Sequence, residues 1–369
     1  MTIMRELEKK LRVGILGGTG MVGQRFVVLL ENHPWFQVTT IAASARSAGK
    51  RYEDAVSDRW KLEGESIPDS VKDIIVKDVS EIEAVASEVD FLFSCVEMSK
   101  DEIKAIEEAY AKTETPVVSN NSAHRWTPDV PMVVPEINVE HFAVIEEQKK
   151  RLGTKKGFIA VKPNCSIQCY VPALAAWKEF EPYELAVSTY QAISGAGKNF
   201  GDWPEMVGNI IPYIGGEEEK SEEEPLKILG TYEDGKIKNA DNIRITAQCV
   251  RVPVLYGHTA AGFVKFRKKP TKEELIDRLK NFKGFPQEHD LPSAPKPFIQ
   301  YCEEENRPQV QQDVYYENGY GVSVGRVRED SVFDFKFIGL SHNTVRGAAG
   351  GGVISAETLV ELGYITAKE

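Results

Sequence analysis

A glycine-rich turn near the N-terminus constrains the fold of this chain more than any other feature. In RVGILGGTGMVGQRFVVLLENHP, a short apolar strand (13–16) runs into the turn, and a helical pattern follows to about residue 33. Glycines spaced G-x-G-x-x-G let backbone N–H groups approach a pyrophosphate at a helix N-terminus. The alternative is a tight turn kept only for packing. The placement favours a dinucleotide site with contacts from Gly18, Thr19, Gly20, Met21, Val22 and Gly23.

The second predicted strand ends without the acidic residue that binds the ribose 2′-hydroxyl of NAD. FQVTTIAAS continues into ARSAGK, which offers Ser44, Arg46, Ser47 and Lys50. Serine hydroxyls and a guanidinium suit a 2′-phosphate through charge-assisted hydrogen bonds, whereas a carboxylate at this place selects NAD. The loop therefore favours NADP, with a solvated basic loop as the alternative.

The length and charge of the chain limit its organisation and its partners. A chain of 369 residues with 42% apolar residues exceeds one ordinary core and suggests two domains with a cleft between them. The net charge of −11 argues against nucleic acid or an anionic membrane as the main partner, so a small anionic ligand needs a local basic pocket. No apolar run approaches the roughly 18 residues of a spanning helix, and five cysteines suggest no disulfide framework. We expect a cytoplasmic protein with reduced thiols.

Strand and helix patterns divide the chain into two parts. Early segments such as DFLFSCV and TPVVSN flank an amphipathic segment (99–113), and this alternation predicts a doubly wound parallel sheet. We place the domain junction in the charged stretch 146–157. Later segments such as VFDFKFIGL alternate apolar and polar residues, which predicts an antiparallel sheet with one buried face. Helical spacing returns from about residue 343.

Cys165 is the strongest candidate for a nucleophile. In KPNCSIQCY, Asn164 is a good N-cap for a helix over 165–180, and Pro163 fixes an extended approach. A thiol in the first turn of a helix faces the helix dipole, which lowers its pKa toward neutrality. Cys169 would lie one turn later on the packed side, and C-x-x-x-C lacks the spacing of a structural zinc site. A core cysteine is the alternative, and no metal is expected.

The histidines include candidates for the proton partner that a thiolate needs when it attacks a carbonyl. His33, His141 and His289 lie in charged or turn segments, and we predict them at the surface. His258 follows Gly257 between two predicted strands, where its imidazole can project into a cleft. We predict His258 as the acid/base residue, with a satisfied histidine at a strand end as the alternative.

Ten motifs, taken in order, resemble one known family. The family is the archaeal and fungal branch of the aspartate-semialdehyde dehydrogenases, and the resemblance covers residues 12–364. It implies a reversible, NADPH-dependent reduction of L-4-aspartyl phosphate to L-aspartate 4-semialdehyde through a cysteine thioester, in biosynthesis of lysine, threonine, methionine and isoleucine. The motifs are GGTGMVGQRF, AASARSAGK, NNSAHRW, VPEIN, PNCS, QAISGAG, NIIPYIGGEEEK, RVPVLYGH, YGVSVGRVRED and SHNTVRGAAG.

The resemblance also implies roles for individual residues. The nucleophile of the family falls on Cys165, its acid/base histidine on His258, and the glutamine that orients the acyl group on Gln191. Arg251 would bind the substrate α-carboxylate, and Glu218 would bind its ammonium. The remaining implied contacts are Lys220, Arg125 and Asn121 near phosphate, and Ser194, Gly195, Asn343 and Gly347 at the cofactor.

The fold implied by the resemblance is α/β and similar to that of glyceraldehyde-3-phosphate dehydrogenase. A Rossmann-like NADP-binding domain would comprise residues 1–157 and 343–369. A catalytic and dimerisation domain with a largely antiparallel sheet would comprise residues 158–342, and a homodimer or homotetramer is implied. The sequence departs from the branch where Ala260 replaces the usual acidic residue after the histidine.

Three other functions compete with this interpretation. Malonyl-CoA reductase, an archaeal relative on the same scaffold, replaces two positions that this chain keeps as Asn164 and Glu218. Acyl-glutamyl phosphate reductase would not need a glutamate that binds an ammonium. A catalytically idle NADP-binding protein would be expected to lose the thiol, the imidazole or the arginine, and all three are present.

Overall fold

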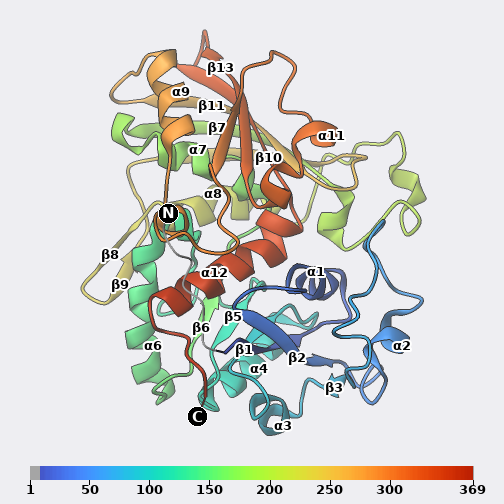
Figure 1. Cartoon of the computed structure of the whole chain (residues 1–369). Helices are drawn as coiled ribbons and strands as arrows, with labels where there is room; N and C mark the ends of the chain where they lie inside the picture. Colours follow the sequence, from blue (N-terminus) through green and yellow to red (C-terminus); the bar gives the residue numbers. More distant parts are fainter. Residues whose placement is uncertain (1–8, 369) are drawn as a thin grey trace.

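Two six-stranded sheets organise the molecule, one in each half of the sequence (Figure 1). The computed structural model describes residues 9–368, so the first eight residues of the predicted NADP-binding domain lie outside the described residues. A hairpin of β8 (Thr231–Glu233) and β9 (Lys236–Lys238) forms a third, two-stranded sheet. No described helix is both long and apolar enough to span a membrane.

The first sheet is parallel and doubly wound, as predicted. Its order is β3-β2-β1-β4-β5-β6, and the order reverses between β1 and β4. In such sheets a dinucleotide binds at the carboxyl ends of the strands beside this reversal, which is where the glycine turn follows β1. The strands are β1 (Leu11–Leu16), β2 (Phe36–Ala43), β3 (Lys77–Asp78), β4 (Phe91–Ser94), β5 (Val117–Ser119) and β6 (Ile159–Val161).

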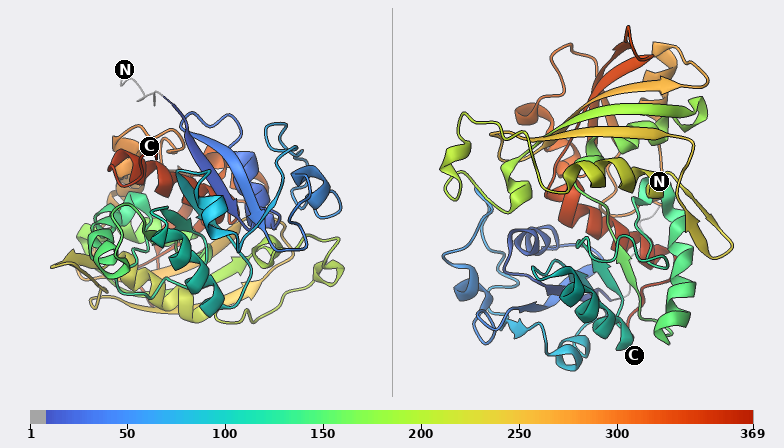
Figure 2. Two further views of the ribbon diagram at one scale, coloured as in Figure 1. Left: turned by 90° about the horizontal axis from the view of Figure 1, so that it is seen from below. Right: turned by 180° about the vertical axis from the view of Figure 1, so that it is seen from behind.

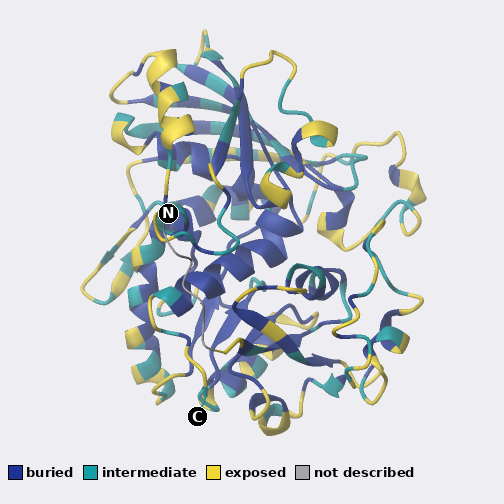
Figure 3. Ribbon diagram, viewed as in Figure 1, coloured by how far each residue is buried: buried dark blue, intermediate teal, exposed yellow. Residues whose placement is uncertain are grey.

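Helices from both ends of the chain pack around this sheet (Figure 2). The last helix, α12, contacts α1 and β5, so the C-terminal segment returns to the first sheet. It lies between the two sheets and is buried along almost its whole length (Figure 3). The helices are α1 (Met21–Leu29), α2 (Tyr52–Val56), α3 (Ile82–Ala86), α4 (Lys100–Lys112), α5 (Pro135–Asn138), α6 (Ile145–Leu152) and α12 (Gly350–Glu361).

The charged stretch 146–157, where we predict the domain junction, is largely helical. Most of it forms α6, which ends at Gly153 in the left-handed conformation. Glutamates in the first turn of α6 and lysines in the last complement the helix dipole, which explains how so charged a segment is helical. β6 follows and pairs with β5, so the first sheet continues to Val161.

The second sheet is mixed, with antiparallel pairs at its centre and a parallel pair at each edge. Its order is β10-β7-β11-β14-β13-β12. Because β7 and β10 are parallel and in register, their last residues, Gln191 and Arg251, lie side by side. The strands are β7 (Pro182–Gln191), β10 (Arg244–Arg251), β11 (His258–Phe266), β12 (Ile299–Cys302), β13 (Val322–Glu329) and β14 (Phe335–Ser341).

One face of the second sheet is buried under helices, and the other keeps half-exposed side chains. Along β11, buried and half-exposed residues alternate throughout. Phe263 and Ala261 belong to the half-exposed set and pair with Ala186 on β7 and Ile338 on β14. The helices of this half are α7 (Val171–Ala176), α8 (Glu217–Ile228), α9 (Lys272–Asn281), α10 (Phe285–Glu288) and α11 (Val310–Asp313).

Candidate active site

The glycine turn is built for close backbone packing at the start of α1. Gly17 has φ +83°, and a Cβ on it would lie 2.5 Å from the carbonyl oxygen of Cys95. A Cβ on Gly23 would lie 2.4 Å from the carbonyl oxygen of Gly17, so only glycine lets the helix approach the turn this closely. A cavity of about 350 Å³ opens beside the turn and is lined by Gly17, Thr19 and other residues.

The basic loop after β2 forms one wall of this cavity. Ser44 and the exposed Arg46 line it, together with Arg59, which sequence reasoning missed. Ser47 is 1% exposed and does not line it; its Oγ accepts a hydrogen bond from Arg59 Nη2 at 3.1 Å. Two guanidinium groups therefore border the place where a 2′-phosphate would bind, and Ser47 orients one of them.

Other predicted cofactor residues lie beneath the turn or beyond it. Met21 and Gly23 are buried in α1, and Gly18 packs against Ile41. Val22 lines a second cavity, of about 110 Å³, which also contains Cys165. The first turn of α1 thus separates the two cavities.

The chain after Cys165 is not the single helix that we predicted. A short 3₁₀ turn (Ser166–Cys169) precedes α7, because Pro172 lacks the N–H that would continue a helical hydrogen-bond ladder. Asn164 still caps the turn: its Oδ1 accepts a hydrogen bond from Ser166 N at 2.7 Å.

The predicted lowering of the Cys165 pKa by a helix dipole is also wrong for the free protein. A single 3₁₀ turn carries little dipole. Burial raises the pKa of the thiol, and Glu217 acts in the same direction, whereas Lys162, Arg125 and Arg251 oppose them. Nearby cations, and not a helix dipole, are thus what counteracts the rise in the pKa of the Cys165 thiol.

The thiol and the predicted imidazole are neighbours. Cys165 Sγ lies 3.3 Å from His258 Nε2, and Cys165 is partly exposed whereas the other four cysteines are buried. His258 begins β11, and its Nδ1 accepts a hydrogen bond from Ala192 N at 3.0 Å. Burial and then Arg251 lower the pKa of His258 to about 3, so this imidazole is neutral near pH 7.

Two of the three histidines predicted at the surface are buried. His33 is 5% exposed, and its Nε2 lies 2.8 Å from Glu357 Oε1 on α12. His141 is fully buried and bonds to Asn138 Nδ2 at 3.0 Å. Only His289 is exposed. The surface prediction rested on the polar residues next to these histidines in the sequence. Both rings are buried because the folded chain brings hydrogen-bond partners to them.

Gln191 and Arg251 lie at one edge of the thiol site. Arg251 Nη1 donates to the carbonyl oxygen of Ala192 at 2.7 Å, next to the amide that bonds to His258. Gln191 is 1% exposed, and its Nε2 donates to Thr189 Oγ1 at 3.2 Å. The end of β7 therefore holds both the arginine and the imidazole.

The loop after β7 and the segment before α12 close the thiol cavity. Gly195 lies so close to Arg251 that a Cβ would be 3.0 Å from its Nη1. Asn343 Nδ2 donates to Ser194 Oγ at 2.8 Å, and Asn343 Oδ1 accepts from Gly257 N at 2.8 Å. A Cβ on Gly347 would lie 2.7 Å from Cys165 Cβ. These four predicted positions all line the cavity.

The carboxylate that bonds to Asn164, beside the thiol, belongs to Glu217, the neighbour of the predicted Glu218. Glu217 is the first residue of α8 and is 8% exposed. Its Oε1 accepts hydrogen bonds from Asn164 Nδ2 at 3.0 Å and Lys220 Nζ at 2.8 Å. Although burial opposes the effect, Lys220 lowers the pKa of Glu217, which is therefore charged. Lys220 and Glu217 thus form one unit at the site.

Glu218 faces a different element. Its Oε1 accepts hydrogen bonds from Gln248 Nε2 at 2.9 Å and Cys249 N at 3.1 Å, both on β10. One residue rotates a helix by about 100°, so adjacent glutamates point to different neighbours. The run EEEK contains three glutamates, and the position of each around the helix decides which one faces the thiol.

Arg125 lines the thiol cavity but already holds an ion pair. Its Nη1 donates to Glu224 Oε1 at 2.8 Å, and its Nε donates to the carbonyl oxygen of Lys162 at 3.1 Å. Glu224 Oε2 accepts from Asn164 N at 2.6 Å. Arg125 and Glu224 therefore brace the loop that carries the nucleophile, in addition to any contact with phosphate.

Asn121 does not reach the thiol cavity, contrary to the prediction, whereas its neighbour Asn120 does. Asn121 Nδ2 donates to Glu107 Oε1 at 3.1 Å and to Ser94 Oγ at 3.2 Å, beneath the first sheet. Asn120 lines the cavity instead. Side chains of residues that follow a strand still point alternately to opposite sides of the sheet. Adjacent residues such as Asn120 and Asn121 therefore face different surroundings.

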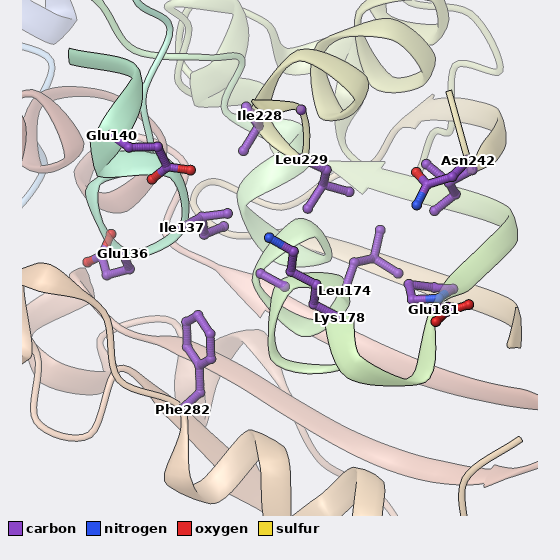
Figure 4. Close-up of a pocket in the computed structure, with 14 residues that line it drawn as sticks. Glu136, Ile137, Glu140, Leu174, Lys178, Glu181, Ile228, Leu229, Asn242 and Phe282 are labelled. Carbon is purple, nitrogen blue, oxygen red and sulfur yellow. The ribbon is translucent and has the colours of Figure 1, made fainter. Parts of the chain in front are cut away.

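A third hollow lies away from the thiol and contains none of the predicted site residues (Figure 4). This groove of about 180 Å³ has an apolar lining that includes Leu174, Ile228 and Phe282, and Lys178 extends into it. Within residues 9–368, no three histidine, cysteine or acidic side chains gather as metal ligands would.

Comparisons with known proteins agree with this geometry. Two family models match: semialdehyde dehydrogenase, NAD binding domain, over residues 12–145, and semialdehyde dehydrogenase, dimerisation domain, over residues 171–346. Aspartate-semialdehyde dehydrogenase from Methanothermobacter thermautotrophicus is 41% identical over 95% of this chain and 99% of the relative. The enzyme from Schizosaccharomyces pombe is 42% identical over 96% of this chain and 99% of the relative.

A solved structure extends the likeness to the fold. Aspartate semialdehyde dehydrogenase from Candida albicans, crystallised with NADP, superposes with a TM-score of 0.86 at 38% identity and covers 97% of this chain and 100% of its own. The fold and the matched domains thus define a nucleotide-binding semialdehyde dehydrogenase. Within that class, the chain belongs to the aspartate-semialdehyde dehydrogenase family.

Proposed function

We propose that this chain is an NADP-dependent aspartate-semialdehyde dehydrogenase, which reversibly converts L-4-aspartyl phosphate into L-aspartate 4-semialdehyde and phosphate. The observation that carries the proposal is the set of groups around one thiol. Cys165 Sγ lies 3.3 Å from an imidazole, with Arg251 and Glu217 acting electrostatically on the same sulfur. A nucleophile with cations and one carboxylate around it suits an acyl donor that is also an α-amino acid.

Arg251 and Glu217 are proposed to hold the two charges of the substrate. The planar guanidinium of Arg251 can pair with the α-carboxylate. Glu217 Oε2 is buried and accepts no hydrogen bond from any described residue, so a substrate ammonium would satisfy it. These two contacts would fix the acyl carbon of the substrate against Cys165.

The remaining residues are proposed to act on the acyl group and the phosphate. Gln191 orients the acyl group beside the sulfur, and the Nε2–H of His258 can donate to the oxyanion that forms when the thiolate attacks. Lys220 and Arg125 supply positive charge for the leaving phosphate. Thiolate attack breaks the acyl–phosphate bond and leaves a thioester on Cys165, which hydride reduces to the aldehyde.

The first cavity fits NADP. The approach of Gly23 to Gly17 leaves the start of α1 open to a pyrophosphate, and the exposed Arg46 with Arg59 borders the position of a 2′-phosphate. No acidic residue follows β2 within the loop 44–50. When bound, the cofactor would supply or accept the hydride. Val22 belongs to α1 and lines the thiol cavity, so it could contact the cofactor there.

Malonyl-CoA reduction is the second candidate, and the site disfavours it. A malonyl group carries no ammonium, so it would leave Oε2 of the charged Glu217 without a hydrogen-bond donor. Asn164 Nδ2 donates to Glu217 Oε1 and holds that carboxylate in place. The site therefore favours a zwitterionic substrate.

A homodimer through the half-exposed face of the second sheet fits the matched dimerisation domain. Phe263, Ala261 and Ile338 give this face an apolar centre. Mass measurement in solution distinguishes a homodimer from a homotetramer. We further propose a cytoplasmic location, because the acidic chain has reduced cysteines and small-molecule substrates.

The test is formation of NADPH from aspartate semialdehyde, inorganic phosphate and NADP, followed by absorbance. We expect turnover that requires phosphate and disappears in Cys165→Ser. Turnover of malonyl-CoA with NADPH in the reverse assay, without turnover of the semialdehyde, would replace the proposal with the second candidate.

A further inference from the structure

Arg346 is a buried arginine to which the proposed function gives no role. Its side chain is 1% exposed, and it lies in the segment between β14 and α12. Thr344 and Gly347 of the same segment line the thiol cavity, whereas Arg346 does not. The guanidinium therefore points away from the cavity, and any effect of it on the reaction acts through other residues.

The guanidinium of Arg346 joins elements from distant parts of the chain. Its Nη1 and Nη2 donate to Oε1 and Oε2 of Glu136 on α5, at 2.7 and 2.6 Å. Its Nε donates to Gln168 Oε1 at 3.1 Å, in the 3₁₀ turn that follows Cys165. Its Cζ lies 4.7 Å from the centroid of the Phe298 ring. A planar fork that is also stacked on a ring has a fixed orientation, which an ammonium group would not have.

The backbone next to Arg346 packs directly on the nucleophile. Residues 345–349 form a wide helical turn, in which Gly347 N donates to the carbonyl oxygen of His342 at 2.9 Å. Turns of this kind are rare and occur mostly as single turns at functional sites. A Cβ added to Gly347 would lie 2.7 Å from Cys165 Cβ. The placement of this turn therefore decides how closely the cavity wall approaches Cys165.

One guanidinium thus ties both sides of the nucleophile together. Gln168 belongs to the turn that carries Cys165, and the backbone of Arg346 leads directly into the wall at Gly347. Glu136 and Gln168 are buried as well. A buried ion pair keeps one geometry, because any other geometry would leave a charge without its partner in a medium of low dielectric constant.

We propose that Arg346, held by Glu136, is a positioning residue that fixes Cys165 relative to the wall at Gly347. Acyl transfer requires the reacting atoms within narrow limits, and a displacement of about 1 Å can lower a rate by about 10²-fold. Arg346 lies outside the cavity and acts through Gln168 and Gly347. The inference rests on the proposed function only in that Cys165 is the nucleophile.

The first test removes the charge that holds Arg346. Glu136→Gln preserves the shape of the side chain but loses the fork, and residue 136 does not line the thiol cavity. It should lower kcat for NADPH formation from aspartate semialdehyde by about tenfold to 10²-fold and change KM by less than about threefold. A rise in KM without a fall in kcat would overturn the inference.

Asp90→Asn is the matched control. Asp90 is a buried carboxylate that accepts hydrogen bonds from Arg12 Nη2 at 2.8 Å and Arg12 N at 2.7 Å. It precedes β4, at the end of the first sheet opposite the glycine turn. Asp90→Asn should lower Tm, as Glu136→Gln does, and keep kcat within about twofold of the wild type. Equal losses of kcat in both variants, well below both Tm values, would show that Glu136 only stabilises the fold.

A second variant alters the guanidinium itself. Arg346→Lys keeps the positive charge but cannot form the fork or the bond to Gln168, so it should lower kcat at least as much as Glu136→Gln does. Wild-type kcat in this variant would overturn the inference. If circular dichroism shows that it does not fold, Gln168→Met decides the question. Gln168→Met removes only the acceptor of Nε and should lower kcat by about threefold to tenfold, and an unchanged kcat would count against Arg346.

Hydrogen exchange followed by mass spectrometry separates this inference from the proposed function, because it needs no substrate. Glu136→Gln should speed exchange in the peptides that contain Gln168 and Gly347 more than Asp90→Asn does. If the wild type fails to turn over the semialdehyde, faster exchange in both peptides would still support Arg346 as the positioning residue of a thiol site. Unchanged exchange in these peptides would overturn the inference whatever the substrate is.

Discussion

The cofactor cavity and the thiol cavity lie on either side of the first turn of α1, but they are built in different ways. The cofactor cavity is lined by short segments near the ends of neighbouring strands, with exposed cations such as Arg46 at its border. The thiol cavity joins five separate segments, and its charged groups are largely buried. One cavity recognises its ligand with solvated groups, and the other fixes charges in position before any ligand arrives.

This difference predicts where substitutions have the greatest effect. Removing a solvated cation forfeits one contact with a ligand, whereas removing a buried charge also leaves its partner unpaired. Arg125 and Glu224 illustrate the second case, because their ion pair also holds Lys162 O and Asn164 N next to the nucleophile. We expect the loss of activity or binding that a substitution causes to decrease with distance from the sulfur of Cys165.

The largest effect is expected at the nucleophile. Cys165→Ser should lower turnover by roughly 10³-fold or more, because a hydroxyl is a poor nucleophile at neutral pH. Steady-state NADPH formation measures it, and the circular dichroism spectrum should be unchanged. Cys169→Ser is the control: it should retain most activity, since Cys169 is fully buried and its Sγ donates to Ser166 O. Equal losses in both variants would contradict the assignment.

The second largest effect is expected on KM in a variant of Glu217, and it distinguishes this residue from the adjacent Glu218. Glu217→Gln should raise KM for aspartate semialdehyde by about tenfold or more, because a charge-assisted contact with the substrate ammonium is lost. Glu218→Gln should change KM by less than about threefold, since Glu218 bonds to β10. A larger effect at Glu218 would restore the assignment made from the sequence and remove Glu217 from the pocket.

These two glutamates also mark the limit of sequence reasoning. Local patterns predict the glycine turn, the parallel sheet, Cys165 and His258, whereas Arg251 and Gln191 are implied only by the resemblance to the family. Glu217 rather than Glu218, and Asn120 rather than Asn121, depend on helix phase and on the direction of one residue after a strand. Lys162 and Arg59 carry no local signal, because their neighbours in the cavity come from distant segments.

At the cofactor cavity, the effect should be moderate and specific. Arg46→Ala should weaken NADP binding by about 1 to 3 kcal/mol, or roughly 5- to 150-fold, and should barely change NAD binding. Fluorescence titration with each cofactor measures the difference. Lys50→Ala, an exposed cation of the same loop that does not line the cavity, is the matched control. Equal losses for NADP and NAD would show that Arg46 does not contact the 2′-phosphate.

The smallest effect concerns Glu107, a buried carboxyl on α4. Burial raises the pKa of Glu107, although Ser119, Ser94 and Asn121 donate to its Oε1. Because the folded pKa is raised, stability falls as the pH rises from about 4.5 through that pKa. Glu107→Gln should remove this part of the pH dependence and leave stability at pH 4 nearly unchanged. Thermal unfolding across the pH range checks it, and parallel curves for both proteins would contradict it.

The central claim, that Cys165 carries the acyl group of an aspartyl substrate, has one direct measurement. The protein is mixed with aspartate semialdehyde and NADP in the absence of phosphate, quenched in acid, and digested for mass spectrometry. The account predicts that the peptide containing Cys165 gains the mass of one aspartyl group, and that added phosphate removes it. An unmodified Cys165 peptide while NADPH accumulates, or an aspartyl group on another residue, would contradict the account.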